Sequence, residues 1–76
     1  MEKAYNISDL YFEGDYLFIV VDNQIIKVKL SDISKKLMNA SEIERADYKI
    51  SPSGYGIHWQ KLDEDISING LLRISK

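Results

Sequence analysis

Two short runs near the start of the chain, residues 16–21 and 24–29, are rich in β-branched and aromatic residues and are separated by Asp22 and Asn23. Such runs predict strands, and Asp and Asn tolerate the positive φ angles of a two-residue hairpin turn. This turn gives the hairpin one fully apolar face: Leu17, Ile19, Val21, Ile26 and Val28. The other face carries Tyr16, Phe18, Val20, Ile25, Lys27 and Lys29.

The next segment changes from strand spacing to helix spacing. Apolar residues recur four positions apart, and Ser31 supplies an N-cap, so we expect one short helix at about 31–39. Ser41 followed by Glu44 has the pattern of a capping box. The pattern predicts a helical turn at about 41–46.

Extended segments are expected on both sides of this helical region. Residues 4–12 predict a strand that joins the hairpin through turn residues 13–15, which makes a three-stranded β-meander. Proline and glycine within residues 52–54 predict a tight connection between two further extended runs, a second β-hairpin. The C-terminal residues predict a helical turn that docks Leu71 and Leu72 onto the core.

The predicted order β-β-β-α-β-β, closed by a helical turn, describes an α+β fold, a small two-layer domain with helix packed on sheet. The 76 residues suffice for one domain spanning 1–76. Without cysteine the chain has no disulfide and no Cys-based zinc site. It contains no signal-peptide pattern and no apolar run of about 20 residues. We therefore expect a cytoplasmic protein with no membrane contact.

The candidate chemistry is concentrated in GIHWQKLDEDIS, whose signature positions are Gly56, Ile57, His58, Trp59, Asp63, Glu64, Asp65 and Ser67. One interpretation is a ligand or metal site built by His58 with the three acids. The chain lacks a second histidine and the alternating acids of a calcium loop. Acids ahead of a helical turn also complement the helix dipole. Capping by Asp65 or Ser67 is therefore the favoured interpretation.

A catalytic site would need a nucleophile beside His58 and a third group that orients the histidine. Ser51, Ser53 and Ser67 are available, but their spacing selects none of them. The glycines of residues 54–56 precede an extended run instead of a helix, which favours a turn over a phosphate loop. We expect no enzymatic activity and no cofactor.

A basic cluster occurs within ten residues: Lys27, Lys29, Lys35 and Lys36. Such a face can contact phosphates, which makes a nucleic-acid-binding regulator one alternative. The formal charge of −2 and the pI of about 5.2 weigh against it, because nucleic-acid affinity comes mainly from phosphate neutralisation. A solvated face is the favoured interpretation.

The first hairpin is apolar on both of its faces, whereas one short helix covers only one of them. The second face must be covered by other parts of the chain or by another protein. This surface, consisting of Tyr16, Phe18, Val20 and Ile25, is the predicted partner-binding site. Its occupant is expected to be a protein partner or a second copy of the chain.

The chain also resembles a known family, the small bacterial proteins catalogued as domain of unknown function 2442. The resemblance is carried by Arg45, by ISPSGYGIHW at 50–59, by LDEDIS at 62–67 and by GLL at 70–72, and it departs at Gln60, where a proline is expected. It implies a small α+β domain in which a β-meander packs with helix. It also implies genes that lie beside a second small gene, as in toxin–antitoxin pairs, and it supplies no catalytic residues.

The leading hypothesis is a non-enzymatic interaction module that binds a protein partner, such as the antitoxin-like half of a pair. The alternatives are the ligand or metal site at His58 with Asp63, Glu64 and Asp65, and the nucleic-acid-binding regulator through the lysine face.

Overall fold

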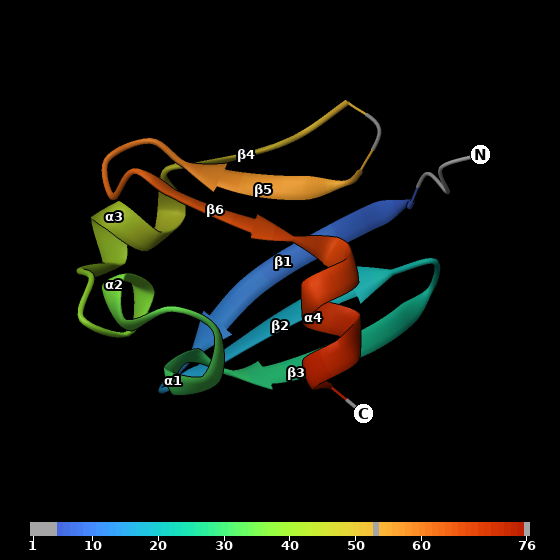
Figure 1. Ribbon diagram of the computed structural model, residues 1–76, viewed down its shortest axis with the longest axis horizontal. Coiled ribbons are helices and arrows are strands. Elements are labelled where there is room, and N and C mark those ends of the chain that lie inside the picture. The colour runs from blue at the N-terminus through green and yellow to red at the C-terminus, as the bar shows by residue number, and fades with distance from the viewer. Residues whose placement is uncertain (1–4, 53, 76) are drawn as a thin grey trace.

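A computed structural model describes residues 5–52 and 54–75 of the chain, which form two three-stranded antiparallel sheets and short helices (Figure 1). Chain order gives β1 (Ile7–Glu13), β2 (Tyr16–Val21), β3 (Gln24–Lys29), α1 (Leu30–Ile33), α2 (Lys35–Met38), α3 (Glu42–Ala46), β4 (Tyr48–Ile50), β5 (Gly56–Trp59), β6 (Glu64–Ser67) and α4 (Ile68–Ile74). The N-terminal sheet has the order β1-β2-β3 and the C-terminal sheet the order β4-β5-β6. The α+β class is confirmed.

The core lies between the two sheets, with α4 and α1 contacting β3 (Figure 1). Every second residue of β2 and β5 points into it, as the alternation of strand side chains requires. The buried side chains are Leu10, Leu17, Ile19, Val21, Val28, Leu30, Leu37, Ile57, Trp59, Ile66, Ile68 and Leu71. Each sheet therefore has one face in the core and one face turned outward.

The first hairpin has the register that its sequence predicts. Val21 pairs with Gln24, and the pairing continues without a shift along both strands. Asp22 and Asn23 have φ angles of 50° and 68°, which a two-residue primed turn requires. The strand predicted at 4–12 is β1, which begins at Ile7 and continues to Glu13; residue 4 lies outside the described residues.

The single helix expected at 31–39 is wrong in one respect, because Ser34 divides it into α1 and α2. Ser34 is extended, with φ −164° and ψ 115°, and its Oγ accepts the backbone N–H of Leu37 at 3.1 Å. Ser34 rather than Ser31 is thus the side-chain N-cap in this segment. The Ser34 hydroxyl also donates to Glu64 Oε2 at 2.6 Å, a contact 30 residues away that local spacing does not reveal.

The capping box of α3 is confirmed. Ser41 Oγ accepts the N–H of Glu44 at 3.2 Å, and Glu44 Oε1 accepts the N–H of Ser41 at 2.9 Å. The second hairpin is also confirmed, with β4 pairing antiparallel to β5.

The acidic triplet does not form the N-terminus of a helix, as the capping interpretation required, because the chain continues from it through β6 before α4 begins. Asp63 ends the turn after β5 with a φ of 50°, and Glu64 and Asp65 belong to β6. Ser67 is the actual cap of α4, since its Oγ accepts the N–H of Gly70 at 3.0 Å. Of the two caps proposed from the sequence, Ser67 is confirmed and Asp65 is wrong.

Arg45 joins the helical region to both sheets. Its guanidinium donates to the carbonyl oxygens of Leu37, Met38 and Gly14 at 3.0, 3.0 and 3.2 Å, and it lies 5.3 Å from the ring centre of Phe12. The Arg45 carbonyl accepts the Trp59 indole N–H at 2.9 Å. These bonds satisfy carbonyls at the end of α2, which have no partner within the helix.

Among the described residues, no helix has the length and apolar character needed to cross a membrane.

Candidate functional site

The outer face of the N-terminal sheet is the first candidate site, and we call it the aromatic face. Cross-strand pairing places nine residues on it in three rows: Asp9, Val20 and Ile25; Tyr11, Phe18 and Lys27; Glu13, Tyr16 and Lys29. Directly paired residues of an antiparallel sheet point to the same side. No described element packs over this side, where Ile25 is 68% exposed and Tyr11 is 41% exposed.

The aromatic rings of this face are packed against one another. Tyr11 and Phe18 are stacked, with ring centres 5.0 Å apart and planes inclined by 4°. The Lys27 ammonium lies 4.4 Å from the ring centre of Tyr16 and 5.8 Å from that of Phe18. Stacking and cation–π contacts hold these side chains in a fixed arrangement. The face is therefore a preformed surface.

Charge is distributed across the aromatic face by strand. Asp9 and Glu13 come from β1, whereas Lys27 and Lys29 come from β3. The central strand, β2, contributes only aromatic and apolar side chains to this face. The face as a whole is neutral, with acids along one edge and lysines along the other.

The predicted partner-binding residues lie together on this face. Tyr16 and Ile25 are exposed, and Phe18 and Val20 are half-buried. Tyr11 was missed, although it stacks on Phe18. The alternation of strand side chains places Tyr11 on the face opposite to its neighbours Leu10 and Phe12. Its position beside Phe18, however, depends on the register of β1.

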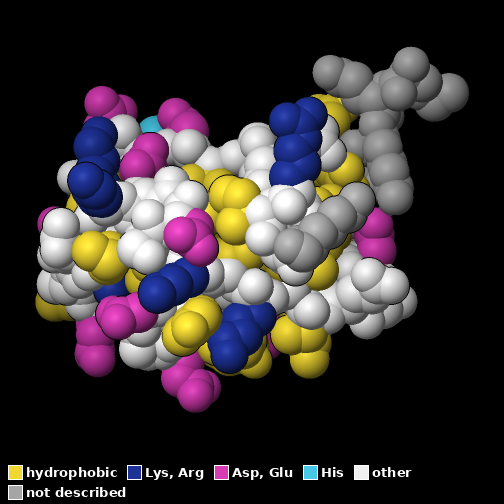
Figure 2. Space-filling model, turned by 60° about the horizontal axis from the view of Figure 1, so that its bottom comes forward, with side chains coloured by type: hydrophobic (Ala, Val, Ile, Leu, Met, Phe, Trp, Pro, Cys, Tyr) yellow, Lys and Arg dark blue, Asp and Glu magenta, His cyan; other side chains and the backbone are white. Residues whose placement is uncertain are grey.

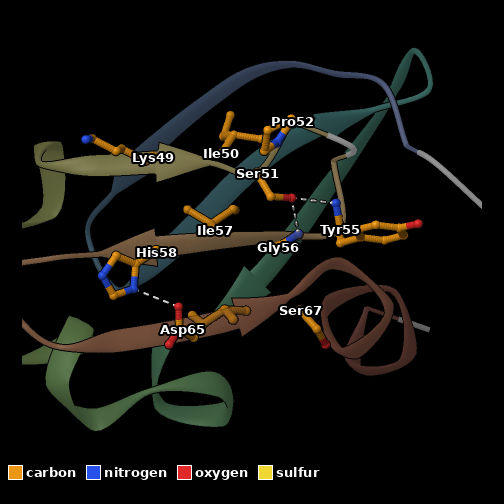
Figure 3. Close-up of a pocket in the computed structure, with 11 residues that line it drawn as sticks. Lys49, Ile50, Ser51, Pro52, Tyr55, Gly56, Ile57, His58, Asp65 and Ser67 are labelled. Atoms are coloured by element: carbon orange, nitrogen blue, oxygen red, sulfur yellow. Dashed lines mark hydrogen bonds and ion pairs between the residues drawn. The ribbon is translucent and has the colours of Figure 1, made fainter.

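A groove on the outer face of the C-terminal sheet is the second candidate site (Figure 3). It has a volume of about 680 Å³ and is lined by all three strands and the loop between β4 and β5. Lys49, His58 and Asp65 form a row across the strands. His58 Nδ1 lies 2.7 Å from Asp65 Oδ1, and the two side chains point toward each other in Figure 3. We call this pair the His–Asp pair.

The chemistry of the His–Asp pair follows from its hydrogen bond. An ionised carboxylate only accepts, so Nδ1–H donates to Asp65 and Nε2 is left for a ligand, as an acceptor in the neutral imidazole and as a donor in the imidazolium. The His58 and Asp65 side chains are 43% and 79% exposed, so solvent reaches the pair. The pair can hold a ligand by hydrogen bonding, but its exposure weakens its electrostatic effect.

The rim of this groove is a turn organised by Ser51. Its Oγ accepts the N–H groups of Tyr55 and Gly56 at 2.9 and 3.2 Å (Figure 3). Gly54 has a φ of 70°, and a Cβ at that position would come within 2.0 Å of the Tyr5 carbonyl oxygen. Glycine is therefore required there by both conformation and space. Ser53, a candidate nucleophile from the sequence, lies outside the described residues.

The acids that the sequence grouped with His58 are separated by the fold. Asp65 joins His58, whereas Glu64 accepts from Ser34. The Asp63 backbone carbonyl accepts from Lys36 at 3.3 Å. Within residues 5–52 and 54–75, no three His, Cys, Asp or Glu side chains converge on a point that a metal ion could occupy. The four-residue site at His58 is thus reduced to a pair.

The lysines of the candidate basic cluster are divided between two surfaces. Lys27 and Lys29 stand on the aromatic face, while Lys35 and Lys36 belong to α2. Figure 2 shows basic and acidic side chains interspersed on the side in view, without a field of one sign. The side in view therefore lacks the continuous positive footprint of a nucleic-acid binder.

Comparison with known proteins gives a family and a fold. The sequence model of the family described as "Protein of unknown function (DUF2442)" matches residues 7–76. The fold is similar to the crystal structure of a protein of unknown function from Rhodospirillum rubrum ATCC 11170, with a TM-score of 0.71 and 22% identity over 95% of this chain and 90% of that chain. No match was found among the curated proteins.

Proposed function

This chain belongs to the DUF2442 family of proteins of unknown function, and from that premise we propose that it is a non-enzymatic domain that binds a protein partner through the aromatic face. The comparisons assign no activity to the family, so the support for this role comes from the chain's own surfaces.

The uncovered aromatic face carries the proposal. Large apolar side chains on an outward sheet face remain in water in the single chain, including Tyr11, Tyr16 and Ile25. Complete burial of one such side chain is worth about 1.5–3 kcal/mol. Aromatic residues with a charged rim are also the composition found at protein interfaces. A partner that covers this face would gain several such contributions.

The serines near the His–Asp pair support a non-enzymatic role. Ser51 Oγ accepts the two N–H groups of its turn, and Ser67 Oγ caps α4. A nucleophilic serine must instead lie within hydrogen-bond reach of its base. Both hydroxyl oxygens accept hydrogen bonds from backbone N–H groups. The proposal therefore includes the lack of enzymatic activity.

The antitoxin-like role is the finer form of this proposal. The partner is then the product of the neighbouring small gene, as the family resemblance implies. Co-expression of the two products, followed by size-exclusion chromatography, tests this role. We expect one shared peak at micromolar concentration, and two separate peaks would argue against this partner.

A pair of matched variants tests the surface itself. Ile25→Asp places a charge on the aromatic face at its β3 edge, whereas Ile43→Asp places the same charge on α3, where the isoleucine is 72% exposed. An unpaired charge in an apolar interface should weaken the complex about tenfold or more. Isothermal calorimetry on the co-purified pair should show this loss for Ile25→Asp alone. Equal affinities for the two variants would contradict the proposal.

Binding of a small organic ligand in the groove is the second candidate function. The observation that favours it is the position of the His–Asp pair inside a groove of about 680 Å³, with Nε2 left for a hydrogen bond to a ligand. A fragment library screened by NMR on the ¹⁵N-labelled chain should shift amides of β4 and β5. His58→Ala should weaken those hits, while Lys61→Ala, in the exposed loop after β5, should not. Fragments that bind His58→Ala as tightly as the wild type would eliminate this function.

A further inference from the structure

We propose that the partner of the aromatic face is a second copy of this chain, packed face to face about a two-fold axis parallel to β2. The inference rests on the proposed function, because it names the occupant of the same face. The support comes from the order of charges across the three strands.

The register arranges this face in three columns of different chemistry. β1 supplies Asp9 and Glu13, β2 supplies aromatic and apolar side chains, and β3 supplies Lys27 and Lys29. Acids and lysines therefore line opposite edges, with an apolar column between them. A surface with opposite charges at its two edges is complementary to itself when one copy is turned over.

A two-fold axis parallel to β2 turns the copy over in the required sense. It places β1 of each copy over β3 of the other, and β2 over β2. In the same row, Glu13 then faces Lys29 of the second copy, and Tyr11 faces Lys27 of the second copy. Such an interface uses the same patch on both subunits, as closed two-fold dimers do. It gives two ion pairs, two cation–π contacts and a shared apolar centre, and it also sets Asp9 of each copy opposite Ile25 of the other.

The charges select this axis over the perpendicular one. An axis that runs across the strands would place β1 over β1 and β3 over β3. Asp9 would then face Glu13 of the second copy, and Lys27 would face its own counterpart. Like charges placed opposite each other across an interface disfavour that association. The parallel axis is therefore the arrangement that this face permits.

The charged groups at the edges are available for these contacts. Neither Glu13 nor Lys29 forms an ion pair with another described residue, and both are exposed. The apolar column on β2 is partly shielded in the single chain, where Lys27 lies over Tyr16. Stacking of Tyr11 on Phe18 keeps the central row flat enough for a second sheet.

The size of the face sets the expected strength. Three strands about 4.8 Å apart, with about six residues each at 3.3 Å, give a footprint of about 14 by 20 Å per copy. This planar footprint is about 280 Å² per copy, well below the roughly 800 Å² per partner of a standard specific interface. Sheets packed in this way are also rotated by about 30°, which widens the gap at the corners of the face, where Glu13 and Lys29 lie. We expect a weak, reversible dimer with a dissociation constant in the micromolar range.

A charge-swap experiment tests the inference. Sedimentation equilibrium of the full chain, from a few micromolar to several hundred micromolar, measures the dissociation constant of the wild type. Glu13→Lys and Lys29→Glu should each raise it about tenfold, because each puts like charges opposite each other twice per dimer. The double swap, E13K with K29E, restores both pairs and should return the constant to near the wild-type value.

Matched controls and opposing outcomes separate the alternatives. Glu42→Lys and Lys61→Glu change exposed charges outside the aromatic face and should leave the dissociation constant unchanged. Circular dichroism spectra confirm that every variant is folded. A tighter dimer for Glu13→Lys would indicate the perpendicular axis and overturn the proposal. A double swap as weak as the single swaps would also overturn it.

The result can be distinguished from a failure of the proposed function. A wild-type chain that stays monomeric at several hundred micromolar overturns the second-copy inference alone. The proposed role of the aromatic face is then tested separately, by comparing the affinities of Ile25→Asp and Ile43→Asp for the neighbouring gene product. If Ile25→Asp leaves both the dimer and that complex intact, both proposals are wrong.

Discussion

At the scale of single residues, Arg45 shows how one side chain joins elements that are distant in the sequence. Its guanidinium bonds carbonyls of α2 and of the turn after β1, and its own carbonyl bonds the indole of Trp59. The resemblance to the family marked Arg45 as a shared residue without giving it a role. The contacts assign it a structural role, because its guanidinium bonds three backbone carbonyls from two separate segments of the chain.

Arg45→Lys should destabilise the fold by about 2 kcal/mol, since an ammonium cannot donate to three separate carbonyls as the planar guanidinium does. Urea unfolding monitored by the fluorescence of Trp59 measures the loss. Arg73→Lys, at an exposed position on α4, should change stability by less than about 0.5 kcal/mol. Similar losses for both variants would show that the three bonds contribute little.

At the scale of elements, the break between α1 and α2 is decided by a contact outside the segment. Ser34 is buried, caps α2 and donates to Glu64 on β6. Ser31 offered an equally good cap on the local sequence. Only Ser34 also meets a carboxylate from the other sheet, and that bond favours an extended conformation at this position.

Ser34→Ala should lower the free energy of unfolding by about 2 kcal/mol, because it removes the cap of α2 and the hydroxyl donor to a half-buried carboxylate. Ser31→Ala, within α1 and exposed, should be neutral to within about 0.5 kcal/mol, since alanine favours the helix. Thermal unfolding of both variants makes the comparison. A greater loss for Ser31→Ala would restore the single-helix interpretation.

At the scale of the whole molecule, the domain is a thin sandwich measuring 35 × 24 × 17 Å. Two sheets share one core, so each sheet exposes its second face (Figure 1). A small domain buries a limited fraction of its surface. Here the exposed large apolar side chains include Tyr11, Tyr16 and Ile25 on the aromatic face, while others, such as Ile43 and Ile74, lie on helices. Dimerisation would bury that face and produce four layers.

The proposed dimer should also respond to salt. Its edge contacts are between exposed charges, which salt screens over about 10 Å at 0.1 M. The dissociation constant of the wild type should therefore rise with ionic strength while the apolar centre keeps part of the affinity. The double swap should show the same salt dependence, because it retains the same number of pairs.

The amino-acid sequence alone settles the elements that depend on neighbouring residues. The register of the first hairpin follows from the turn at Asp22 and Asn23, and α3 begins where Ser41 and Glu44 bond each other. These are interactions over a few residues, so their signals are local. The apolar second face of the hairpin was predicted from the same alternation.

The tertiary structure decides the features that depend on distant partners. Residues 64–67 form a strand because β5 pairs with them. The local sequence favours a helix start instead, because acidic residues commonly lie at helix N-termini. That pairing sends Asp65 to His58 on one face and Glu64 to Ser34 on the other, which divides the acidic triplet. The register of β1 likewise brings Tyr11 onto Phe18 and places Glu13 in the same row as Lys29. Strand pairing joins residues that no local pattern connects, and so it alone determines which side chains share a surface.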